Sequence, residues 1–95
     1  MTDIWERTHP LKGETLYTIA QRKPFDIIRI LHDRIVFVPH DGNGTQRWAS
    51  REQIETITHL VQSGKVINPK LVREQYPNDQ NTSYIAAIVK AITTK

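Results

Sequence analysis

The chain of 95 residues contains no cysteine, and this single absence excludes several kinds of chemistry. Disulfide bridges, thiolate nucleophiles and thiolate metal clusters all need a residue that is not there. The sequence also lacks any apolar run near the roughly 20 residues that a membrane span requires. Its first residues, 1–7, have no apolar stretch of the kind found in secretion signals. We therefore expect a soluble, cytoplasmic protein with no membrane contact.

Aromatic residues and excess charge are also scarce. Aromatic side chains make up 7% of the chain, and 13 Lys and Arg against 10 Asp and Glu leave a formal charge of +3. A charge this small favours solubility but is too weak to indicate a nucleic-acid partner by itself. A chain of this length fits one domain with a modest core.

What the sequence does contain is a series of short periodic segments. Residues 1–13 carry isolated apolar groups between breakers, which predicts an extended N-terminal arm docked through Trp5, followed by a single domain over residues 14–95. Enrichment in β-formers predicts strands over residues 15–20, 25–31, 34–38 and 45–49. We expect a two-residue turn at His32-Asp33 and a tight hairpin turn centred on Gly42-Asn43.

Three helices are expected after the strands. Ser50 and Gln53 have the spacing of a capping box, and Asn68 followed by proline is a second helix start. Ser83 or Thr82 is expected to cap the last helix. The pattern predicts an α+β fold: a small, mainly antiparallel sheet of three or four strands, followed by three helices, with two or more packed on one sheet face.

Strand alternation predicts which side chains share a face. With the turns placed as above, one face carries large apolar groups and is expected to be the core. Its members are Ile28, Ile30, Ile35, Phe37 and Trp48. The opposite face carries three guanidinium groups, extended by two cations at a neighbouring turn, and its predicted binding residues are Arg22, Lys23, Arg29, Arg34 and Arg47.

Two interpretations of this basic face stay open. In one, the arginine stems cover a half-exposed sheet and pair with Asp26, Glu14 or Glu52. In the other, the guanidinium groups bind phosphate or carboxylate groups of a partner, because arginine suits bidentate contacts.

Motifs for catalysis or metal binding are weak. Asp41, Asn43 and Thr45 occupy the first ligand positions of a calcium loop, but Gln46 stands where that loop needs glycine, so a plain hairpin is favoured. The four histidines have no ligand-like spacing. Ser50 and Ser83 are explained as helix caps. We predict no cofactor, no metal and no enzymatic activity.

Three groups of residues resemble one known family. Lys23-Pro24-Phe25-x-Ile27 and Ser83-Tyr84-Ile85-x-Ala87-Ile88 are two of them, and Gly44-x-x-Arg47-x-x-Ser50-Arg51-x-x-Ile54-Glu55 is the third. Together they are similar to a small bacterial, notably cyanobacterial, family of uncharacterised proteins, over residues 15–92. The resemblance implies a cytoplasmic bacterial domain and transfers no catalytic or binding residue.

These patterns predict a small non-catalytic binding module, with protein interaction or regulation as its role. The alternative is nucleic-acid binding through the basic sheet face. A protein partner is therefore expected, while the sequence does not indicate its identity or the oligomeric state.

Overall fold

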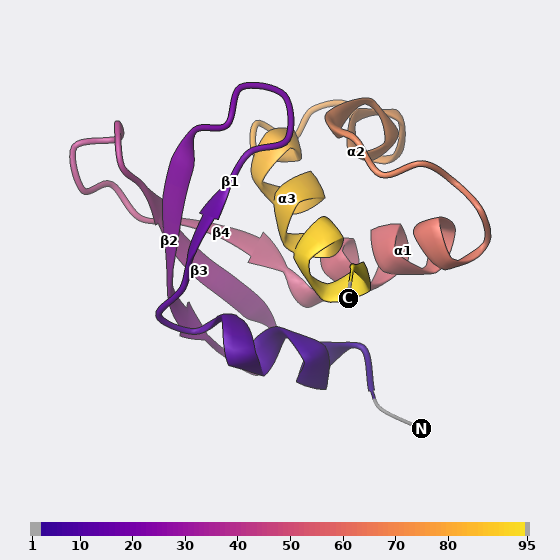
Figure 1. Ribbon diagram of the computed structural model, residues 1–95, viewed down its shortest axis with the longest axis horizontal. Coiled ribbons are helices and arrows are strands. Elements are labelled where there is room, and N and C mark those ends of the chain that lie inside the picture. The colour runs from indigo at the N-terminus through magenta and orange to yellow at the C-terminus, as the bar shows by residue number, and fades with distance from the viewer. Residues whose placement is uncertain (1–2, 95) are drawn as a thin grey trace.

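The computed structural model describes residues 3–94 and has the predicted α+β architecture. Figure 1 shows a sheet with the three α-helices gathered to one side of it. Within the described residues the elements, in chain order, are the 3-10 helix η1 (Trp5–Leu11), β1 (Thr15–Tyr17), β2 (Pro24–Ile30), β3 (Arg34–Pro39), β4 (Arg47–Ser50), α1 (Arg51–Gln62), α2 (Pro69–Gln75) and α3 (Thr82–Thr93).

The four strands of the described chain form one antiparallel sheet in the order β1-β2-β3-β4. Its inner face and the helices α1 and α3 share one hydrophobic core, while α2 packs on α3. The completely buried members of this core are Phe25, Ile27, Ile35, Phe37, Ala49, Ile54, Ile57, Val72, Ile85, Ala86, Ile88 and Val89. Among residues 3–94, no helix has the length and apolar character needed to cross a bilayer.

The predicted helix starts after the sheet are largely confirmed. The Ser50 Oγ accepts a hydrogen bond from the Gln53 N–H at 3.0 Å, and the Gln53 Oε1 accepts one from the Ser50 N–H at 3.1 Å. This reciprocal pair satisfies two backbone donors that a helix leaves free. Asn68 caps α2 through the Leu71 N–H. The cap predicted for α3 is wrong, because that helix begins after Asn81.

The N-terminal segment is helical where an extended arm was predicted. The Asp3 Oδ1 accepts the Trp5 N–H at 3.2 Å, which satisfies a free donor at the start of η1. Trp5 is only 4% exposed, and its Nε1–H donates to the Leu31 carbonyl at 3.0 Å. Docking through Trp5 is therefore confirmed, and the segment belongs to the core of the domain.

The register between β2 and β3 follows the prediction only near the turn. Ile30 pairs with Ile35 as expected, and the Leu31 N–H donates to the Arg34 carbonyl across the two-residue turn. A β-bulge then lies between Ile27 and Arg29, so Ile27 pairs with Phe37. Because a bulge adds one residue to one strand, it reverses the facing of the side chains beyond it.

The register between β3 and β4 differs from the predicted one by a single residue. Phe37 pairs with Arg47, and Val36 pairs with Trp48. The connecting loop closes through hydrogen bonds from Gly42 N–H to the Pro39 carbonyl and from Thr45 N–H to the Gly42 carbonyl, not through a two-residue turn. A slip of one residue transfers each side chain to the opposite face. Trp48, predicted to lie in the core, is therefore 51% exposed.

Candidate functional site

The outer face of the sheet is the surface opposite the helices. Cross-strand partners share a face, and the pairs Tyr17–Pro24, Thr15–Asp26, Asp26–Val38, Arg29–Val36, Val36–Trp48 and Arg34–Ser50 assign its members. We call the following residues the outer sheet face: Thr15, Tyr17, Asp26, Arg29, Arg34, Val36, Val38 and Trp48.

The five predicted binding residues do not share this face. Arg29 and Arg34 lie on it, as predicted. Arg47 pairs with the buried Phe37 and therefore projects to the side of the helices. Lys23 lines a pocket together with Arg47, on that other side. Arg22 is exposed in the loop before β2, in a left-handed conformation with φ of 58°.

Trp48 and Arg34 form a stacked pair at the β4 edge of the outer sheet face. The guanidinium carbon of Arg34 lies 4.6 Å from the centroid of the indole ring. The same guanidinium donates to both carboxylate oxygens of Asp33 at 3.3 Å, and this hydrogen bonding lowers the pKa of Asp33. Val36, directly opposite Trp48, is only 6% exposed. The indole thus covers an apolar strand residue and keeps half of its own surface in water.

A hydrogen-bonded cluster lies at the β1 side of the same face. The Asp26 Oδ1 accepts from Thr15 Oγ1 at 2.6 Å and lies 2.8 Å from His40 Nε2. The bond from Thr15, and next the one from His40, hold the pKa of the Asp26 carboxyl below its ordinary value of 3.8. Tyr17 extends the surface with a side chain that is 54% exposed.

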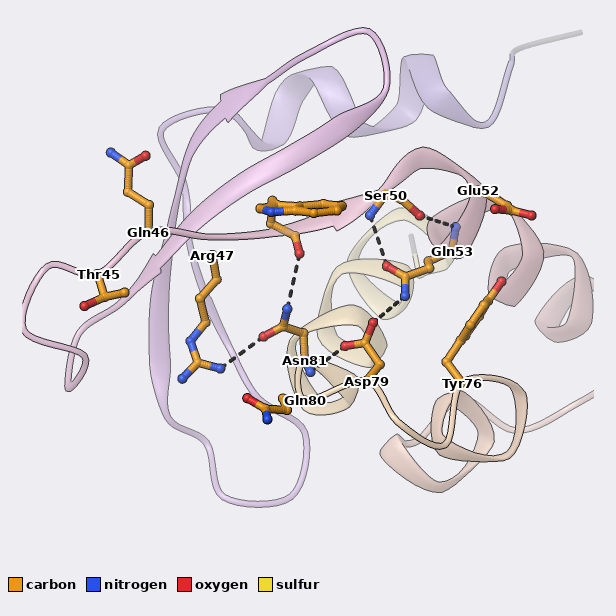
Figure 2. Close-up of a pocket in the computed structure, with 11 residues that line it drawn as sticks. Thr45, Gln46, Arg47, Ser50, Glu52, Gln53, Tyr76, Asp79, Gln80 and Asn81 are labelled. Atoms are coloured by element: carbon orange, nitrogen blue, oxygen red, sulfur yellow. Dashed lines mark hydrogen bonds between the residues drawn. The ribbon is translucent and has the colours of Figure 1, made fainter.

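A second polar assembly ties β4 to the helices. Figure 2 shows Arg47 directed at Asn81, and Gln53 directed at Asp79. The Arg47 NH1 group donates to Asn81 Oδ1 at 3.1 Å, and Asn81 Nδ2 donates to the Trp48 carbonyl at 3.2 Å. Gln53 Nε2 donates to the Asp79 carboxylate, whose other oxygen accepts the Asn81 N–H. These contacts line an open groove of about 580 Å³ and hold the loop before α3 against the sheet.

Sequence reasoning missed Trp48 and Tyr17 as surface aromatics, and Arg73 as a neighbour of Arg47. When the predicted strand pairing is wrong by one residue, an exposed tryptophan is assigned to the buried face of the sheet. Trp48 was assigned to the core for this reason. Arg73 belongs to a helix far along the chain, and only the tertiary packing brings it beside β4. Within residues 3–94, no group of three or more His, Asp or Glu side chains is placed to hold a metal ion.

The fold and this surface define a two-layer α+β protein whose open sheet face carries aromatic and arginine side chains. Comparisons of the chain with protein-family models, with curated proteins and with solved structures found no match. The resemblance to a cyanobacterial-type family therefore stays a prediction.

Proposed function

We propose that this protein is a small non-catalytic binding module that recognises another protein through its outer sheet face. The observation that carries the proposal is the half-exposed Trp48, stacked with Arg34 on the edge strand β4 of a face that the helices leave open within the described residues. Tryptophan, tyrosine and arginine are the residues most enriched at the energetic centres of protein interfaces.

The charges of the face favour a protein over a polyanion. Arg34 is paired with Asp33, and Asp26 adds a second carboxylate beside the exposed Tyr17. Arg29 is exposed and makes no ion pair among residues 3–94. The complementary partner presents an apolar side chain to Trp48 and a carboxylate to Arg29.

The test is affinity purification with matched variants. Trp48→Ala and Arg29→Ala should each lose a partner that wild type retains, whereas Lys90→Ala, an exposed substitution on α3, should retain it. Loss of the aromatic anchor should weaken the purified complex by about 30-fold or more. Retention should survive nuclease treatment and a rise from about 50 to about 200 mM salt, unlike a phosphate-based complex. Equal retention by wild type and Trp48→Ala would overturn the proposal.

Single-stranded nucleic acid is the second candidate, and the Arg34–Trp48 stack is the observation that favours it. Aromatic side chains beside arginines form stacking platforms for bases. A labelled oligonucleotide should then bind wild type at about 50 mM salt and weaken steeply as salt rises. Arg29→Ala and Arg34→Ala should both remove that binding. No binding at low salt would eliminate this candidate.

A further inference from the structure

Three cationic residues from separate elements line one pocket on the helix side of the sheet. Lys23 comes from the loop before β2, Arg47 from the first position of β4, and Arg73 from α2. The pocket has a volume of about 350 Å³ and is completed by the first turn of α3. Its described lining contains no carboxylate. We call it the cationic pocket.

The protein supplies little negative charge to offset these three groups. Lys23 Nζ lies 3.7 Å from Asp41 Oδ2, but both side chains are more than half exposed, so the pair is weak. Arg47 is held by the neutral amide of Asn81. Arg73 makes no ion pair within the described chain. Like charges gathered in a pocket raise the free energy of the empty site, and an anion relieves that repulsion.

Arg47 is also fixed in position before any ligand arrives. Its guanidinium carbon lies 5.7 Å from the centroid of the Tyr84 ring, and its NH1 group is bonded to Asn81. The bond to Asn81 uses one of the five N–H donors of a guanidinium. A side chain that is already ordered loses less conformational entropy on binding.

Neutral donors complete the lining. Gln80, Ser83 and Tyr84 also line the pocket, and their side chains carry amide and hydroxyl groups that donate to oxygen atoms. Phosphate offers several acceptor oxygens and up to two negative charges, which suits arginine and lysine together with hydroxyl and amide donors.

We infer that the cationic pocket binds the phosphate group of a small phosphomonoester. The volume is that of a small-ligand site, large enough for a phosphate with a short organic group. This site lies on the side of the sheet opposite the outer sheet face, so it stands independently of the proposed protein interaction.

The experiment is an NMR titration of the ¹⁵N-labelled full chain with inorganic phosphate, and then with glycerol 3-phosphate, at constant ionic strength set by chloride. Saturable shifts should appear in residues 18–23 and 80–84. Arg73→Gln should raise the dissociation constant about tenfold, because it removes a charge-assisted contact. Arg73 is exposed, so this variant keeps the fold, which unchanged signals away from the pocket will verify.

Arg29→Gln, which removes the same charge from the outer sheet face, is the matched control and should leave the dissociation constant unchanged. Equal weakening in both variants would show attraction to net charge alone and would overturn the site. Absence of saturable shifts with both phosphate probes would also overturn it. Binding of an oligonucleotide by these residues, without binding of the two phosphates, would replace the inference with a phosphodiester contact.

Discussion

The two tryptophans show how differently one residue type is used in this chain. Trp5 is buried and donates its indole N–H to a backbone carbonyl, whereas Trp48 covers Val36 and faces water. Composition alone predicts packing roles for both, because a small core needs every large apolar side chain. Because Trp48 lies on the open face of the sheet, its indole is also available for contact with a partner.

We predict stability losses of very different size for the two positions. Trp5→Ala should lower the free energy of unfolding by about 3–5 kcal/mol, as expected for removal of a buried aromatic. Trp48→Ala should lower it by about 1 kcal/mol or less, since it removes an exposed cation–π contact with Arg34. Urea unfolding measures both.

Iodide quenching provides a separate test of the exposure of the two tryptophans. Iodide should quench the fluorescence of Trp5→Phe, where Trp48 emits, far more than that of Trp48→Phe. The reverse order would contradict the assignment of the two faces.

Asp26 provides a pH-dependent prediction at the same scale. Its pKa is lower in the folded protein than the ordinary 3.8, so its contribution to stability is present above that pH and declines as pH falls through the folded pKa. The difference in unfolding free energy between wild type and Asp26→Asn, measured at neutral pH, should therefore shrink below about pH 4. Thr15→Val removes the shorter of the two hydrogen bonds to this carboxyl, which is also the main cause of its lowered pKa, so in that background the effect of Asp26→Asn should be smaller. An unchanged effect would show that the Thr15 contact does not lower this pKa.

At the scale of elements, local capping chemistry was the most reliable guide. The reciprocal bonds of Ser50 and Gln53 depend only on residues three apart, so the sequence contains all the information. The end of α1 is equally local: Gly64 has φ of 113°, and the Lys65 N–H donates to the Leu60 carbonyl.

The register of the hairpins could not be predicted in the same way. The bulge between Ile27 and Arg29 and the one-residue slip of β4 change which residues pair, and neither follows from the identity of the turn residues alone. The predicted membership of the basic face was consequently correct for only some of its residues. Arg29 and Arg34 share it, whereas Arg47 joins Lys23 and Arg73 on the other side.

The caps allow a matched prediction. Ser50→Ala removes a side chain that accepts the Gln53 N–H and should lower the free energy of unfolding by about 1 kcal/mol. Ser83→Ala should have a clearly smaller effect, because α3 begins after Asn81 and no side-chain cap is found there in the described chain. Thermal unfolding of the two variants measures the difference. Equal losses would mean that Ser83 contributes as a cap after all.

At the scale of the whole molecule, one core joins the first helix to the last. Trp5 of η1, Phe25 of β2 and Ile88 of α3 belong to the same buried cluster. A chain with one shared core unfolds as a single cooperative unit. The segment predicted as an N-terminal arm thus packs, as η1, in the same core as the sheet and the helices.

Cooperativity gives the prediction at this scale. Fluorescence of Trp5 in the Trp48→Phe variant, which reports on η1, should follow the same urea transition as far-UV circular dichroism, which reports mainly on the helices. Coincident midpoints and slopes are expected for two-state unfolding. A fluorescence transition at lower urea would show that η1 detaches before the rest of the protein unfolds.

Consecutive residues of a strand project in opposite directions, and in β4 these residues are Arg47 and Trp48. One amide, that of Asn81, accepts from the first and donates to the backbone of the second. A shift of the Arg47 guanidinium toward a bound phosphate would therefore also displace the Asn81 amide, which is bonded to the Trp48 carbonyl. The two neighbouring residues of β4 thus share one hydrogen-bonding partner, and the indole N–H resonance of Trp48 would report such a displacement during the phosphate titration.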